Sequence, residues 1–246
     1  MDLATHFIQK TVEFEGAGDE QFSKYYKLVM QAVTAENAAS VSAIAGSPIE
    51  KTFLNSLILT FIKNDGLGLL IHPTFKNSCV EIDEFRRDLS RFKEFVSWFE
   101  KNKPADTMED YLDNVVQHGG MTQEERDYFT RLIFRYRYIP MDNSYHMTLQ
   151  PCFPEIKVGG RGIRADIYFW IPSKPRIKIV VECDGFQYHS SKEAFKKDRQ
   201  RDRAFQARGY EVLRYTGSEI FNDPVNSAFE LASYLWDRAK NQRSSA

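Results

Sequence analysis

The spacing of apolar residues changes character near residue 145 of this 246-residue chain. Before that point, apolar positions recur every three or four residues, which is typical of helices with one buried face. After it, β-branched and aromatic residues form short dense runs, which are typical of strands. The pattern predicts helices over 47–63, 82–100, 108–117, 122–138, 191–208 and 226–241, and strands over 69–72, 145–151, 165–170, 178–185 and 210–215. This order of elements favours an α/β fold.

The same pattern divides the chain into four segments. Residues 1–46 form an N-terminal helical segment that ends in an Ala- and Ser-rich linker. Residues 47–75 hold the first core helix and a short strand. The helix begins at Ser47-Pro-Ile-Glu50, which combines a Ser N-cap, a Pro at the first helical position and a Glu that can close a capping box. Residues 76–140 form a helical insert, and residues 141–246 hold the remaining strands and helices.

Two of the predicted strands, 165–170 and 178–185, are joined by a connector over 172–176 that contains two prolines. A short connector of this kind favours an antiparallel hairpin. If its loop is centred on Lys174, residues at equal distance from that centre lie opposite each other. The hairpin then has a predicted register, which can be compared with a structure.

Carboxylates interrupt both strands of this hairpin. In the predicted register Asp166 lies opposite Glu182, and the two-residue period of a strand puts Asp184 on the same face. Directly opposed side chains have Cβ atoms about 4.5–5.5 Å apart, so the three charges repel one another. A divalent cation such as Mg²⁺ would offset this repulsion. The alternative is that one acid is protonated or is paired with Arg164 or Arg214.

Composition narrows the class of protein. The hydrophobic content of 42% and charged content of 27% are those of a globular chain and argue against disorder. No apolar run reaches the roughly 18 residues that span a bilayer, and the N-terminus lacks a signal-peptide pattern. We therefore expect a cytoplasmic protein that does not contact membranes. Cys79, Cys152 and Cys183 lack CxxC spacing, which argues against a disulfide framework or a zinc site.

Charge is unevenly distributed along the chain. Residues 151–246 carry 17 Lys and Arg against 12 Asp and Glu, whereas residues 1–150 carry 16 against 22. A polyanion such as DNA would be attracted to the C-terminal part. The acidic N-terminal half, or the helical insert, could dock a basic protein partner. Charge scatter without functional meaning is the alternative.

Eight short motifs follow one another along the chain. They are Ser47–Glu50, Gln150, Arg164–Asp166, Val181–Gly185, His189, Asp198–Asp202, Gly209–Tyr210 and Val212–Arg214. In this order they resemble the PD-(D/E)xK nuclease superfamily, and within it the small endonuclease domains related to very-short-patch-repair (Vsr-like) endonucleases. The resemblance covers residues 47–63 and roughly 145–218. It implies a restriction-endonuclease-like mixed sheet flanked by helices, with the active site at the hairpin.

The resemblance also assigns roles to acidic residues. Asp166 and Glu182 correspond to metal ligands, with the backbone carbonyl of Cys183 as a plausible third ligand. Glu50 corresponds to a glutamate that holds a second metal, although a Glu at that place can instead serve only the capping box. Asp184 stands where the superfamily often has Lys, so it is a further ligand or the base that orients water. The implied cofactor is Mg²⁺, with Mn²⁺ as the substitute.

Six further residues complete the candidate site. His189 follows a Gly that allows a tight turn, so it could donate a proton to the leaving group or contact phosphate, or be structural. The predicted phosphate contacts are Arg214, Arg201 and Lys197, and the supporting residues are Gln150 and Gln187. The helix over 191–208 is also rich in opposite charges three and four residues apart, so local ion pairs and a solvated face are the alternative for its cations. The cysteine and histidine ligands of the repair enzymes' zinc are missing, so mismatch repair is not expected.

These observations predict a metal-dependent endonuclease that hydrolyses DNA phosphodiester bonds. The resemblance suggests a setting in prokaryotic defence or mobile-element biology. Two alternatives remain open at the level of sequence. One is a protein that keeps the nuclease scaffold but acts as a binding module. The other is a nuclease that acts on RNA.

Overall fold

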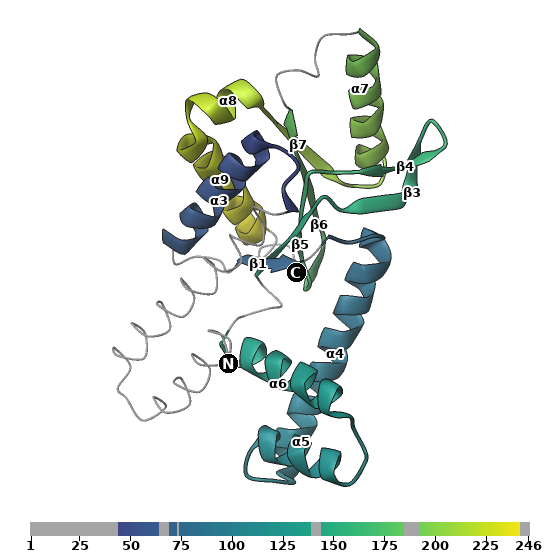
Figure 1. The fold of residues 1–246 in the computed structure, drawn as a ribbon, viewed down its shortest axis with the longest axis vertical. Coiled ribbons are helices and arrows are strands. Elements are labelled where there is room, and N and C mark those ends of the chain that lie inside the picture. The colour runs from purple at the N-terminus through teal and green to yellow at the C-terminus, as the bar shows by residue number, and fades with distance from the viewer. Residues whose placement is uncertain (1–43, 64–68, 73, 139–143, 185–191, 242–246) are drawn as a thin grey trace. The chain divides into compact units, whose positions relative to one another are not determined.

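Figure 1 shows the protein as a computed structural model that describes residues 44–63, 69–72, 74–138, 144–184 and 192–241. The predicted helix within residues 1–46 lies outside these ranges. The described chain divides into two compact units. The first is built from residues up to Ser78 and from Asp142 onward, and the second is Cys79–Met141.

The first unit is organised around a five-stranded sheet with the order β1-β2-β5-β6-β7. Its strands are β1 (Leu69–His72), β2 (Tyr145–Leu149), β5 (Ile167–Ile171), β6 (Lys174–Asp184) and β7 (Glu211–Thr216). The two outer pairs, β1 with β2 and β6 with β7, are parallel, whereas β5 is antiparallel to both neighbours. The predicted mixed sheet is therefore confirmed.

Helices cover one face of this sheet. They are α3 (Pro48–Lys63), α8 (Gly217–Asn222) and α9 (Pro224–Asn241), which lie together on one side in Figure 1. Alternate strand residues such as Met147 and Phe169 point into this layer and are fully buried with Phe53 and Leu235. The two-residue period of the strands thus produces the larger core, because every second side chain enters it.

The opposite face carries α7 (Lys192–Gln206) and a two-stranded ribbon of β3 (Cys152–Val158) and β4 (Arg161–Arg164). Phe153 of β3 meets Phe205 of α7 with ring centroids 5.1 Å apart in an edge-on arrangement. Tyr210, just before β7, completes this aromatic cluster with centroids 5.5 Å from both rings. The aromatic cluster holds the ribbon and α7 against the same side of the sheet.

The sequence pattern did not predict the β3–β4 ribbon or the short helix α8. The turn of the ribbon is Gly159-Gly160, where both residues adopt positive φ. A Gly-Gly pair between extended segments is a hairpin signal, so this ribbon could have been found. Helix α8 is too short for a periodic pattern, and its local mark is the capping box between Thr216 and Glu219.

The hairpin of β5 and β6 has the predicted register but a shorter turn. Ile167 pairs with Val181, and Phe169 pairs with Ile179, as a centre on Lys174 requires. The turn itself is Pro172-Ser173, and β6 already begins at Lys174. An irregularity beside Ile171 absorbs the difference, so the predicted five-residue connector was wrong while the pairing of the remaining residues was right.

The second unit is helical. It contains most of α4 (Ser78–Asn102), together with α5 (Met108–Gln117) and α6 (Gln123–Tyr138). Thr107 caps α5 by accepting a hydrogen bond from the Asp110 backbone at 3.0 Å, and Thr122 accepts from the Glu125 backbone at the start of α6. These helices match the predicted ones within a few residues. Within the described residues, no helix is both long enough and apolar enough to cross a membrane.

Candidate active site

Asp166 immediately precedes β5, at the end of the hairpin. Continuing the strand register by one residue places it opposite Glu182, as predicted. Its Oδ2 accepts a hydrogen bond from the Cys183 backbone N–H at 2.8 Å, and its Oδ1 lies 3.4 Å from the Gln150 amide. Burial raises the pKa of Asp166, although the Cys183 N–H and the charge of Arg201 oppose that rise.

Glu182 lies in β6, between β5 and β7, and is only 4% exposed. Both of its carboxylate oxygens accept from Nη2 of Arg201, at 3.0 and 3.2 Å. Burial raises the pKa of Glu182 to about 8; the charge of Arg201 opposes this rise, and that of Asp166 adds to it. The effect of burial on this pKa therefore outweighs the effect of the Arg201 charge. A second cation beside Glu182 would stabilise its carboxylate form further.

Glu50 in the first turn of α3 is also buried. Its backbone N–H donates to the Ser47 hydroxyl at 3.2 Å, as the predicted cap requires. Its carboxylate, however, accepts from the backbone of Gly46 at 2.9 Å and from the Gln150 amide at 2.8 Å. In a standard capping box the Glu50 carboxylate would accept from the backbone N–H of the cap residue Ser47. Here it accepts from the backbone of Gly46, one residue earlier, and from Gln150. Burial raises the pKa of Glu50, and the charge of Asp166 raises it further.

Gln150 connects the two acids. It is a buried residue at the end of β2 with a positive φ of 49°, and its backbone N–H donates to the Asp166 carbonyl at 2.8 Å. Because its amide contacts Glu50 and lies near Asp166, it holds side chains from α3 and from the start of β5 close together. Gln150, which was predicted to be a supporting residue, therefore lies next to both Glu50 and Asp166.

Asp184 is paired with a different arginine from the one that bonds Glu182, although its charge raises the pKa of both Asp166 and Glu182. Its oxygens accept from Nη1 of Arg214 at 2.7 and 2.9 Å. The same guanidinium bonds Asp202 of α7, with Nη2 at 2.7 Å from Oδ1. Burial lowers the pKa of Arg214, but hydrogen bonds to Asp202 and Asp184 outweigh this and raise it. Of the two roles predicted for Arg214, carboxylate pairing is the one observed here.

Asp202 ends one of the motifs found in the sequence, but its pairing beside the hairpin was not predicted. It is 7% exposed and is bonded by Arg214. A signal was present: Asp198, Asp202 and Phe205 recur at helical spacing on the face of α7 that turns inward. An acid on an otherwise buried stripe indicates a paired charge.

Helix α7 also positions the predicted phosphate contacts. Arg201 bonds the Arg164 carbonyl at 2.6 Å in addition to Glu182, and it lies 3.8 Å from Asp198. It therefore joins α7 to β4 and β6 at once. Lys197 is exposed on the same helix. The predicted residues His189 and Gln187 lie outside the described residues.

The hairpin acids fall within a stretch that matches a known family. A model of the restriction endonuclease-like family REase_MTES_1575 matches residues 151–235. The match supports a nuclease-like domain, and the mixed sheet is consistent with a restriction-endonuclease-like fold. It includes Asp166, Glu182 and Arg201, and it leaves Glu50 and Gln150 outside. No curated protein and no solved structure matched the chain.

The arrangement of the hairpin acids suits a divalent cation held by two protein carboxylates better than one held by three. Among the residues that the structure describes, no three His, Cys, Asp or Glu side chains form a group that could hold a metal. The predicted three-carboxylate set is therefore not assembled, because Asp184 pairs with Arg214 instead. Mg²⁺ commonly takes one or two protein carboxylates and keeps several waters, so Asp166 and Glu182 are the residues that would hold it.

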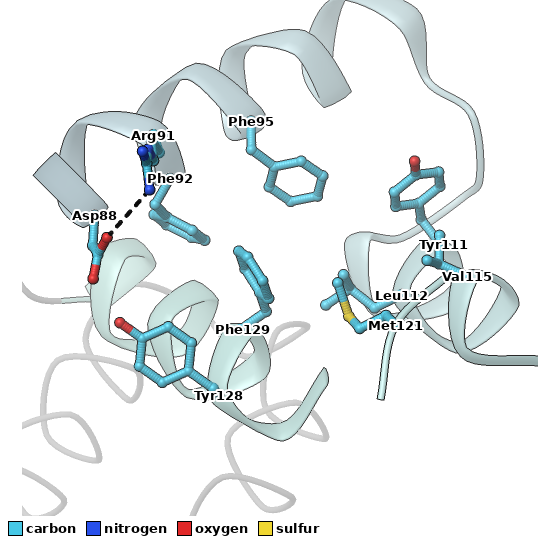
Figure 2. Close-up of a pocket in the computed structure, with 10 residues that line it drawn as sticks. All are labelled: Asp88, Arg91, Phe92, Phe95, Tyr111, Leu112, Val115, Met121, Tyr128 and Phe129. Carbon is cyan, nitrogen blue, oxygen red and sulfur yellow. Dashed lines mark ion pairs between the residues drawn. The ribbon is translucent and has the colours of Figure 1, made fainter. Parts of the chain in front are cut away.

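The helical unit contains an apolar cavity of about 390 Å³. Figure 2 shows rings of α4, α5 and α6 facing one another around it. The residues that line it are Asp88, Arg91, Phe92, Phe95, Tyr111, Leu112, Val115, Met121, Tyr128 and Phe129. None of the candidate acids lies there, and its only charged residues form an exposed pair 3.9 Å apart. Its lining therefore offers no group suited to phosphodiester chemistry.

Proposed function

We propose that the chain is a metal-dependent endonuclease of the PD-(D/E)xK type that hydrolyses DNA phosphodiester bonds. The observation that carries the proposal is the pair of acids at the end of the hairpin, the partly buried Asp166 and the buried Glu182, inside the stretch that matches a nuclease-like family. Buried acids with raised pKa values in one place are characteristic of sites that bind cations or move protons. A Vsr-like relationship is part of this proposal.

Asp166 and Glu182 would hold the cation, with the Cys183 carbonyl as a further oxygen donor and Glu50 beside a second position. When bound, Mg²⁺ supplies a Lewis acid for the phosphate oxygen and lowers the pKa of a coordinated water. The Cys183 N–H orients the Asp166 carboxylate through the 2.8 Å hydrogen bond. The Gln150 amide holds Glu50 close to Asp166.

Arg201 has a double task in this proposal. In the protein alone its Nη2 donates to Glu182, and its side chain is 28% exposed. A scissile phosphate beside Glu182 offers the guanidinium an alternative anionic partner, to which it can donate two parallel hydrogen bonds. We assign Arg201 to that phosphate when DNA is bound. Arg214, paired with Asp184 and Asp202, is assigned to holding β6, β7 and α7 together behind the site.

The competing proposal is a binding module that keeps this scaffold. It is favoured by one observation: Glu182 and Asp184 each accept hydrogen bonds from an arginine. A pair of fully satisfied ion pairs can stabilise a fold without catalysis. Against it stands the raised pKa of Glu182, since burial outweighs the pairing with Arg201.

A cleavage assay separates these proposals. The protein is incubated with supercoiled plasmid, linear duplex, single-stranded DNA and RNA in the presence of Mg²⁺ or Mn²⁺, with EDTA as the metal-free control. We expect nicking or linearisation of plasmid that EDTA abolishes. Asp166→Asn and Glu182→Gln should each lower the rate at least a hundredfold, whereas Glu230→Gln on α9 should not. Wild-type protein that binds all substrates and cleaves none would favour the binding module.

A further inference from the structure

One face of α7 forms a basic stripe away from the sheet. Lys196, Arg199 and Arg203 are exposed and follow one another at spacings of three and four residues, so they share one side of the helix. Asp202 and Phe205 lie on the buried side of the helix. Asp202 is paired with Arg214 at 2.7 Å, and Arg199, at the edge of the stripe, lies 3.5 Å from the same carboxylate.

The β3–β4 ribbon continues the basic surface. Lys157 on β3 and Arg161 and Arg164 on β4 are exposed, and Glu155 is the single acidic residue in the ribbon. The ribbon is fixed to α7 by a hydrogen bond from Arg208 to the Glu155 carbonyl at 3.2 Å, in addition to the aromatic cluster. Figure 1 shows α7 and the ribbon on the same side of the sheet. We call these six exposed cations the basic ridge.

The charges of the ridge are largely unneutralised. Among the ion pairs between described residues, only Arg199 of the six has an acidic partner, Asp202 at 3.5 Å. The ridge therefore presents several cations from two rigid elements, within a chain whose net charge is −1. Clustered positive charge on one face is the electrostatic footprint of a nucleic-acid-binding surface.

An exposed aromatic ring lies among these cations. Phe195 of α7 is 54% exposed, and the Arg199 guanidinium lies 5.0 Å from its ring centroid. Aromatic rings beside cations suit nucleic acid, because deoxyribose or a base can pack on the ring while the cations contact phosphates.

We propose that the basic ridge and Phe195 bind the backbone of duplex DNA, an inference that rests on the proposed nuclease function. The ridge adjoins the candidate site, because Arg201 bonds both the Arg164 carbonyl and Glu182. On α7 the ridge extends from Lys196 to Arg203, which corresponds to a length of about 10 Å on a helix. This length spans about three base pairs at the 3.4 Å rise of DNA, and the cations of the ribbon add further phosphate contacts.

Binding measured without metal tests the ridge independently of cleavage. Fluorescence anisotropy of a labelled 20-base-pair duplex is recorded in EDTA with the full chain, at KCl concentrations from 50 to 200 mM. The double variants Lys157→Ala/Arg161→Ala and Lys196→Ala/Arg203→Ala should each bind about tenfold more weakly. The slope of log affinity against log salt should fall by about two for each, since each lost phosphate contact removes roughly 0.9.

Two further variants make the test specific. Phe195→Ala should weaken binding about fivefold and leave the salt slope unchanged, because it removes packing and no charge. Arg87→Ala/Lys101→Ala removes the same number of exposed charges from α4 and should bind as the wild type does. Thermal unfolding of every variant verifies that the fold is intact.

The outcomes separate the two proposals. Ridge variants that bind duplex DNA with wild-type affinity and salt slope would overturn the ridge, whether or not the protein cleaves DNA. Tenfold tighter binding of RNA or single-stranded DNA than of duplex would overturn the choice of duplex DNA. Loss of binding in the ridge variants, with no cleavage by the wild type under any metal, would sink the nuclease proposal and leave the ridge supported.

Discussion

Nη2 of Arg201 lies 3.0 and 3.2 Å from the two carboxylate oxygens of Glu182. A side-chain cation thus lies beside the carboxylate to which we assign a metal ion. The relationship connects α7, which carries the cations, to β6, which carries the acid. It also means that the guanidinium and the metal compete for one buried group.

Arg201→Met should therefore lower the stability of the metal-free protein and increase its stabilisation by Mg²⁺. Without metal, removal of the guanidinium leaves Glu182 buried and unpaired, which should lower the free energy of unfolding by up to about 3 kcal/mol. Added Mg²⁺ should then raise the melting temperature more in the variant than in the wild type, because the competitor is absent. Differential scanning calorimetry with and without Mg²⁺ measures both effects. An equal response to Mg²⁺ in the two proteins would remove Glu182 from the metal site.

Stability of the metal-free protein should depend on pH through Glu182. Burial raises its pKa from 4.5 to about 8, so the folded protein keeps a proton that the unfolded chain releases. This group's contribution to the unfolding free energy is fully present below pH 4.5 and is lost as pH rises to about 8. Urea unfolding in EDTA from pH 5 to 9 should show this decline in the wild type. Glu182→Gln should lack it, and parallel curves for the two proteins would contradict the assignment.

Asp202→Asn should destabilise the fold although Asp202 does not touch the proposed cation. The substitution removes the charge that Arg214 bonds at 2.7 Å in a buried setting, so we expect a loss of about 1–3 kcal/mol. Asp198→Asn is the matched control on the same helix, because that acid is more exposed and its contact with Arg201 is 3.8 Å. Urea denaturation compares the two. If both variants lose the same unfolding free energy, the ion pair between Asp202 and Arg214 contributes no more to stability than the contact between Asp198 and Arg201.

Glu50→Gln distinguishes a catalytic role from a capping role. The hydrogen bonds that the carboxylate accepts from Gly46 and from Gln150 go to the same oxygen, Oε2, and a Gln carbonyl oxygen can accept both. Stability should therefore be unchanged or slightly higher, since repulsion by Asp166 is removed. The rate of metal-dependent DNA cleavage should fall at least tenfold. Wild-type cleavage by this variant would leave Glu50 with the capping role alone.

Gly162→Ala should loosen the β3–β4 ribbon. A Cβ at this position would lie 2.7 Å from Cα of Pro154, which is backbone and cannot swing away. We expect a loss of about 1–3 kcal/mol, in the range for overpacked positions, with weaker duplex binding in EDTA. Gly159→Asn serves as the control, because Asn tolerates the positive φ of that turn and no neighbour lies within 4 Å. If both variants unfold at the same urea concentration as the wild type, the ribbon is less tightly packed than the contact implies.

The sequence by itself predicted the features that depend on residues close together in the chain. Pro48 after a Ser cap starts α3, and Gly209 with a positive φ of 76° ends the turn that follows α7. The register of β5 and β6 was also predictable, since a tight turn and the two-residue period leave few alternatives. This register was enough to place Asp166 opposite Glu182.

Tertiary structure decided which charges meet. Gln150 bonds Glu50 across 100 positions of the chain, and Arg201 reaches Glu182 only because α7 packs across the sheet. Asp184 shares a strand with Glu182, yet Arg214 on the neighbouring strand and Asp202 on α7 direct it into a separate ion-pair network. Periodicity assigns a side chain to a face, but the choice between partners on that face depends on the packing of elements distant in sequence.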